Sequence, residues 1–171
     1  MADYHLTYSK TEDRLIVSTD DEEQGVALTR RLTREMVKVI AKVVTQQKSA
    51  TTGGNDLVRD TVLNFERSKA VSEAYADGSA RRSKRKSPDA VLSKLARAVD
   101  ISAKRSGGAT LVFRDSGNLL TLALDARGIY VLISAILDIA VSAGWDLPEI
   151  AAWLEPTPSH DADREPPKVI H

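Results

Sequence analysis

The pattern of apolar and polar positions predicts the same order of elements twice along this chain. Residues 4–47 read as three short strands followed by a helix, and residues 95–144 repeat that order. In both copies the third strand runs into its helix through a polar residue and an arginine, as Leu28-Thr29-Arg30-Arg31 and Leu124-Asp125-Ala126-Arg127. We therefore predict an α+β fold built on a duplicated βββα unit, with antiparallel strands and helices packed on them.

The first copy is predicted from alternating β-forming residues at 4–9, 14–19 and 25–28. Thr29 is a suitable N-cap, because its hydroxyl can accept a hydrogen bond from an unpaired amide of the first helical turn. The helix is predicted to continue to about Gln47. Its apolar stripe recurs at helical spacing and comprises Leu32, Met36, Val37, Val39, Ile40, Val43 and Val44.

Residues 90–104, at the start of the second copy, fit two patterns. Leu92, Leu95 and Val99 suit the continuation of a helix that begins at Pro88, whereas residues 98–104 alternate as a strand does. We expect a helix from Pro88 that gives way to a strand near Val99. Turn signals such as Gly107-Gly108 then separate two further strands, at 110–114 and 119–124, with Asp125 as the helix N-cap. One six-stranded sheet and two three-stranded sheets both remain open.

The second helix, residues 127–143, is apolar almost all round. A helix without a polar face is buried on more than one side. It is therefore either a central core helix or part of a subunit interface. For the second alternative, the candidate interface residues are Ile129, Ile133 and Ile136, together with Trp153 from a short C-terminal helix predicted at 147–154.

An insert at 55–94 separates the two copies. Its first part suits a helix packed against the outside of the core through Leu57, Val58, Val62, Phe65 and Val71. A loop follows with five basic residues in six, Arg81, Arg82, Lys84, Arg85 and Lys86. Residues 155–171 have almost nothing to bury and are predicted to be a disordered tail, which leaves 1–154 as a single α+β domain.

Composition excludes several classes of protein. A hydrophobic content of 42% excludes global disorder, and a formal net charge of zero means that no global charge attracts nucleic acid or an anionic membrane. The absence of cysteine excludes disulfides, thiolate nucleophiles and cysteine-ligated metals. We see no secretion signal, and the apolar run at 128–143 is too short and too polar to cross a bilayer. A cytoplasmic location is therefore predicted.

Residues that carry chemistry are few. The three histidines lack metal-binding spacing, and no phosphate-binding loop or nucleophile elbow is present. The acidic run 20–23 is read as a solvated face, with cation binding as the alternative. Asp138 is the only charge inside the apolar helix, but it has no His or Lys partner at helical spacing. We predict no metal and no cofactor, and we keep an enzyme with a dispersed site as an alternative.

Two groups of arginines and lysines could contact an anion. Arg30, Arg31 and Arg34 lie at a helix N-terminus, which favours anions, although the acidic run 20–23 just upstream could neutralise them instead. Between Arg81 and Arg105 the chain has nine basic and two acidic residues. Nucleic-acid binding through the segment 81–105, with steep salt dependence, is therefore one of the alternative functions.

Two resemblances add to these patterns. The stretch Val26-Ala27-Leu28-Thr29-Arg30-Arg31-Leu32-Thr33, with Ala143-Gly144-Trp145-Asp146-Leu147, resembles a group of small uncharacterised bacterial proteins with a Leu-Thr-Arg-Arg helix start; it implies a bacterial or phage origin and no mechanism. The repeated unit also resembles, in architecture alone, the single-stranded nucleic-acid binders of the Pur-alpha and Whirly kind. Those proteins stack bases on exposed sheet aromatics, for which this chain offers only Tyr4, Tyr8 and Phe113.

The leading hypothesis from the sequence is a non-enzymatic protein that acts through protein–protein contacts, as an assembly protein or a homodimer. It rests on the apolar second helix, on the Trp-bearing C-terminal segment and on the absence of catalytic motifs.

Overall fold

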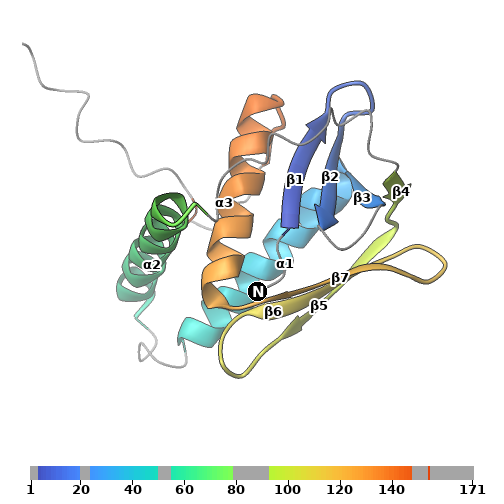
Figure 1. Ribbon diagram of the computed structural model, residues 1–171. Coiled ribbons are helices and arrows are strands. Elements are labelled where there is room, and N and C mark those ends of the chain that lie inside the picture. The colour runs from blue at the N-terminus through green and yellow to red at the C-terminus, as the bar shows by residue number, and fades with distance from the viewer. Residues whose placement is uncertain (1–3, 20–23, 50–54, 79–92, 148–153, 155–171) are drawn as a thin grey trace, which may run out of the picture.

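The structure is a computed structural model that describes residues 4–19, 24–49, 55–78, 93–147 and 154. The predicted α+β class is confirmed, since helices and sheets are combined in the described part (Figure 1). The elements in chain order are β1 (Tyr4–Ser9), β2 (Arg14–Thr19), β3 (Gly25–Thr29), α1 (Arg30–Ser49), α2 (Asp56–Ala76), β4 (Ser93–Leu95), β5 (Ala98–Ala103), β6 (Ala109–Arg114), β7 (Asn118–Leu124) and α3 (Ala126–Ser142).

The strands form two sheets. One has the order β1-β2-β3-β4, and the other has the order β5-β6-β7. Neighbouring strands are antiparallel except for β3 and β4, which are parallel. Each of α1 and α3 thus follows directly from the third strand of an antiparallel meander, in the order that the sequence predicts.

The chain passes from one sheet to the other at Ala96 and Arg97. The amide of Ala96 donates to the carbonyl of Ala27 at 2.9 Å, and the amide of Arg97 donates to the carbonyl of Arg114 at 2.7 Å. This corner shows that the prediction of a helix up to about Val99 is wrong, because residues 93–95 form β4. The helical spacing there is overridden by parallel pairing with β3, a contact that local sequence does not encode.

Side chains cap all three helices at their N-termini. The hydroxyl of Thr29 accepts a hydrogen bond from the amide of Leu32 at 3.2 Å, and the carboxylate of Asp125 accepts one from the amide of Gly128 at 2.7 Å. Both predicted caps are therefore confirmed. At the start of α2 the side chain of Asn55 accepts a hydrogen bond from the backbone amide of Val58.

The helices pack in a fixed order around the sheets. α1 lies against β2, β3 and β5, whereas α3 lies against β1, β7 and α2. α2 is the outermost helix, packed on α3 and α1 on the side away from the strands (Figure 1). The largest completely buried side chains come from both sheets and all three helices: Leu15, Leu28, Met36, Ile40, Leu63, Leu111, Phe113, Leu122, Leu124, Ile129, Leu132 and Ile133.

Within the described part of the chain, we find no helix with both the length and the apolar character needed to span a membrane.

The turn between β5 and β6 requires a glycine at position 108. Gly108 has a φ of +87°, a backbone conformation that residues with a Cβ rarely adopt. A Cβ at this position would lie 2.4 Å from the carbonyl oxygen of Leu124. The backbone of the turn therefore approaches the end of β7 more closely than any side chain would allow.

We predict that Gly108→Ala lowers the free energy of unfolding by about 2–4 kcal/mol. A left-handed backbone costs a residue with a Cβ about 1–2 kcal/mol, and the clash with the backbone of Leu124 adds to that cost. Urea denaturation followed by circular dichroism measures the difference. Gly117→Ala is the matched control, since nothing lies within 4 Å of its added Cβ. Equal effects of the two substitutions would contradict this prediction.

Candidate functional site

Several of the predicted contact residues lie outside the described part of the chain. They are the basic loop residues Arg81, Arg82, Lys84, Arg85 and Lys86, the acidic run 20–23, and Trp153 of the predicted C-terminal helix. The predicted tail at 155–171 lies outside it as well. These predictions stay as they were.

The described end of the basic segment is partly neutralised by its neighbours. Arg97 forms an ion pair with Asp115 at 2.8 Å, and the Asp100 carboxylate pairs with Arg114 at 2.5 Å. Lys104 directs its ammonium group to the carbonyl of Leu124 at 3.3 Å. Within residues 93–105, Arg97 is thus paired with a carboxylate, whereas Lys94 and Arg105 are exposed.

The strand aromatics are not arranged for base stacking. Phe113 is completely buried, and Tyr4 and Tyr8 are half-buried against the core. Burial is also the main cause of a raised pKa at the Tyr4 phenol, with the charge of Asp125 adding to it. A stacking platform needs ring faces open to solvent, and none of these three rings offers one.

The arginines at the start of α1 are directed to different partners. Arg30 donates to the carbonyl of Asp146 at 3.4 Å, and the guanidinium of Arg34 lies 3.7 Å from the carboxylate of Glu35. Arg31 is exposed. Arg30 thus helps to hold the segment after α3 in place.

The three isoleucines named as interface candidates belong to the core of this chain. Ile129, Ile133 and Ile136 are each no more than 1% exposed. Their assignment to a subunit interface is therefore wrong, because strands on one side and α2 on the other already cover α3. The alternative reading of this helix, as a central core helix, is the one that the burial supports.

Asp138 does not sit in a catalytic environment. It is exposed, and its charge acts on Arg67 of α2. Burial lowers the pKa of Arg67, and Asp138 partly offsets that shift. Of the arginines near helix ends, Arg127 pairs with Asp77, and Arg30 contacts the carbonyl of Asp146.

A polar cluster joins the β1–β2 turn to the segment after α3. One carboxylate oxygen of Asp13 accepts hydrogen bonds from the hydroxyl of Tyr8 and the indole of Trp145, both at 2.7 Å. The rings of Tyr8 and Trp145 meet edge to face, with centroids 5.7 Å apart. The hydrogen bond from Tyr8, and then that from Trp145, lower the pKa of Asp13. This cluster is structural, since its groups satisfy one another.

The inner face of α2 is built for close packing on α3. Leu63, Ala70 and Ala74 are its buried residues. Two of the three are alanines, whose small side chains let the backbones of α2 and α3 approach each other. Most of the contact of α2 with the rest of the molecule is with α3.

Polar side chains fix the position of α2 at several points. The two carboxylate oxygens of Glu66 contact the ammonium of Lys48 on α1 and the hydroxyl of Tyr130 on α3, the latter at 2.9 Å. Burial, followed by the contact with Glu66, raises the pKa of Tyr130. Arg67 donates to the carbonyl of Leu154 at 2.9 Å. One helix thus ties together α1, α3 and the C-terminal segment.

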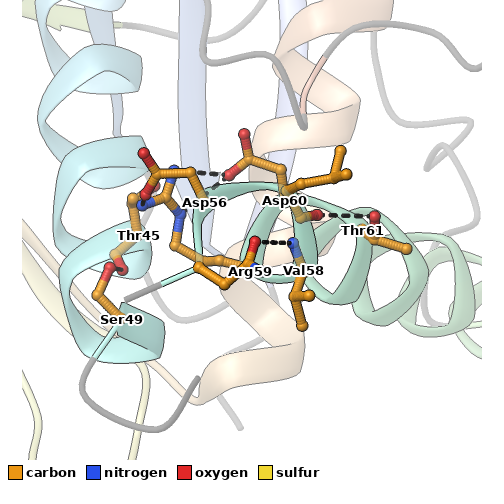
Figure 2. Close-up of polar contacts among 9 residues, drawn as sticks. Thr45, Ser49, Asp56, Val58, Arg59, Asp60 and Thr61 are labelled. Atoms are coloured by element: carbon orange, nitrogen blue, oxygen red, sulfur yellow. Dashed lines mark hydrogen bonds and ion pairs between the residues drawn. The ribbon is translucent and has the colours of Figure 1, made fainter. Parts of the chain in front are cut away.

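Arg59 holds the first turn of α2 (Figure 2). Its guanidinium lies between the carboxylates of Asp56 and Asp60, at 2.5 and 2.9 Å, and these contacts, with that to Asp60 first, raise its pKa. The last turns of α1, marked by Thr45 and Ser49, lie on the same side in this view. Arg59 itself is only 17% exposed, so it is packed at the junction of the two helices.

The outer face of α2 is apolar and open. Leu57, Val58, Phe65 and Tyr75 are 78%, 48%, 68% and 62% exposed. The exposed residues that complete this face, Thr61, Ser68 and Ser72, carry no charge. We call these seven residues, together with the exposed Ala76, the α2 stripe. Large apolar side chains exposed together on one side of a helix are a common feature of binding surfaces.

The predicted packing face of α2 is therefore wrong. Leu57, Val58 and Phe65 face solvent, and Val62 and Val71 are only half-buried. The error has a physical cause: the outer side of the helix carries both of its aromatic residues, while the inner side combines small residues with a charged residue, Glu66, that finds partners on other elements. The steps of three and four residues between Val58 and Tyr75 were the signal available in the sequence.

Comparison with known protein families, with curated proteins and with solved structures finds no match to this chain. Function therefore has to be argued from the site. Among the described residues no group of three His, Asp or Glu side chains is placed to hold a metal ion. The α2 stripe offers hydrophobic contact and hydroxyl groups, which suit binding.

We predict that shortening a side chain lowers the free energy of unfolding on the inner face of α2 and leaves it nearly unchanged on the outer face. Leu63→Ala should lower the free energy of unfolding by about 2–5 kcal/mol, because it leaves a cavity at a completely buried site. Phe65→Ser should change it by less than about 0.5 kcal/mol in dilute protein, because that ring is exposed. Urea denaturation of both variants provides the measurement. A large loss for Phe65→Ser would show that the chain itself covers the stripe.

The Asp13 cluster predicts a pH dependence. Because the folded state lowers the pKa of Asp13 below its ordinary value of 3.8, the ionised carboxylate stabilises the fold above that pH. The stabilisation is lost as the pH falls through the lower, folded-state pKa. We expect Asp13→Asn, which tolerates the local φ of 52°, to be less stable than the wild type at pH 7, with the difference shrinking below pH 3.8. Urea denaturation across this range tests it; a constant difference would contradict it.

Proposed function

We propose that this protein is a non-enzymatic binding protein that contacts another protein through the α2 stripe. The observation that supports this proposal is the exposure of Leu57, Phe65 and Tyr75 on one face of a helix whose opposite face is packed on the core. Burying a large apolar side chain contributes about 1.5–3 kcal/mol, so a partner that covers these three gains a substantial driving force.

The residue types and their spacing support a protein as the ligand. Phe and Tyr are enriched in the central contacts of protein interfaces. An amphipathic helix that presents anchors at steps of three and four residues is a common element of protein recognition. The hydroxyls of Thr61 and Ser68 lie between the anchors and donate within α2, to the carbonyl of Leu57 at 2.8 Å and to the side chain of Asn64 at 3.4 Å, so their oxygens can still accept a hydrogen bond from a partner.

The anchoring of α2 supports the same proposal. Glu66 binds the helix to α1 and α3, and Arg67 binds it to the C-terminal segment, while Arg59 pairs with Asp56 and Asp60 of the same helix. The stripe is therefore presented on a helix that is already formed and positioned. Binding to a preorganised surface loses little conformational entropy, which leaves more of the hydrophobic gain for affinity.

We predict that a photoreactive residue in the α2 stripe cross-links to protein. Phe65→p-benzoylphenylalanine, irradiated in cells that express the chain, should yield covalent protein adducts resolved by denaturing gel and mass spectrometry. The same residue at Thr121, which is exposed on β7, is the matched control and should yield few. No adduct at position 65, or equal yields at both positions, would overturn the proposal.

A further inference from the structure

We propose that α1 carries a second binding surface, a row of four basic side chains that holds the phosphate backbone of a nucleic acid. The row comprises Arg31, Arg34, Lys38 and Lys42, and we call it the α1 basic row. It lies on a different helix from the α2 stripe, so this inference goes beyond the proposed function and does not depend on it. The basis is the concentration of positive charge on one face of a helix in a chain whose formal net charge is zero.

The spacing places the four side chains on one face of α1. Successive members of the row are three, four and four residues apart, and residues at those spacings are neighbours on a helix surface. At a rise of about 1.5 Å per residue, the row extends for about 16 Å along the helix. The buried residues Met36, Ile40 and Val44 lie on the opposite face, which packs on the core.

The charges of the row are accessible and only partly offset. Arg31 and Lys42 are exposed, the side chain of Arg34 is 40% exposed, and Lys38 is half-buried. Glu35 is the one acidic residue of α1, and its carboxylate lies 3.7 Å from the Nε of Arg34. That Nε is buried and has no hydrogen-bond partner within the part of the chain that the structure describes. One carboxylate cannot neutralise four cations, so this face of α1 keeps a net positive charge.

The row works against the stability of the helix that carries it. Arg34 and Lys38, and likewise Lys38 and Lys42, are pairs of like charge four residues apart, which repel each other. The first turn of α1 contains no acidic residue, although the helix dipole favours acids there. A bound polyanion relieves this repulsion, because each phosphate places a negative charge next to the cations. The arrangement is therefore better suited to an anionic ligand than to stabilising the free chain.

A nucleic-acid backbone fits the row better than a protein or a lipid surface does. The centres of protein interfaces are depleted of charged residues and of lysine in particular. A helix that binds a membrane surface buries an apolar face among the lipids, whereas the apolar face of α1 is packed on β2, β3 and β5. Nucleic acid presents a line of evenly spaced negative charges, which Lys and Arg contact. Phosphate contacts carry no sequence information, so we expect binding that is independent of base sequence.

The test measures how the affinity for nucleic acid depends on salt. The full-length chain is titrated into a labelled DNA duplex and a labelled single strand of mixed sequence at about 50 to 200 mM salt, followed by fluorescence anisotropy. The double variant Arg31→Gln/Lys42→Gln removes two exposed cations, and circular dichroism checks that it folds. We expect it to bind at least tenfold more weakly at about 50 mM salt. The slope of log affinity against log salt should become shallower by about 1.8 on the duplex and about 1.4 on the single strand.

Two single substitutions complete the experiment. Glu35→Gln removes the acidic residue of the helix, so we expect it to tighten binding about threefold or more. Lys69→Gln is the matched control, because it removes a lysine of α2 whose side chain is 61% exposed and which lies outside the row. It should keep the affinity and the salt slope of the wild type.

The contrary outcomes overturn the inference. A salt slope unchanged in the double variant would show that nucleic acid is held elsewhere in the chain, and an equal loss in Lys69→Gln would show that position does not matter. Absence of binding to both oligonucleotides at about 50 mM salt would also overturn it. Phosphatidylserine vesicles that retain the chain when neither oligonucleotide does would assign the row to a lipid surface instead. None of these results bears on the proposed function, because cross-linking through Phe65 tests a different helix.

Discussion

The structure depends on covering α3, a helix with almost no polar face. β1 and β7 lie against it on one side, and α2 lies against it on the other. Without α2, the apolar side chains that α3 turns away from the sheets would be exposed to water. This requirement explains why a long helix is inserted between two strand–helix units. The inner face of α2, with Leu63, Ala70 and Ala74, is buried in this contact.

The means by which α2 is held determine what its outer face can do. Hydrophobic contact alone would leave a smooth alanine-rich surface on which a helix can slide or rotate. The contacts of Glu66 with Lys48 on α1 and Tyr130 on α3, and of Arg67 with the carbonyl of Leu154, fix its rotation. An orientation fixed in this way keeps Phe65 in solvent. The exposed stripe is thus a consequence of the same contacts that complete the core.

Local patterns predict the strands and the helix caps because the interactions that form them are local. The alternation along β1 and β2 and the caps Thr29 and Asp125 depend on residues a few positions away. β4 was missed because it exists through parallel pairing with a distant strand. The sequence pattern assigns Leu57, Val58 and Phe65 of the stripe to the core, because the residues that hold the other face of α2 lie on α1 and α3.

The most direct test is hydroxyl-radical footprinting of the wild-type chain over a range of concentrations. The account predicts that Phe65 and Tyr75 are oxidised rapidly in dilute protein, while the completely buried Phe113 stays protected at every concentration. Slow oxidation of Phe65 in dilute protein would contradict the claim that the α2 stripe is open to solvent and available to a partner.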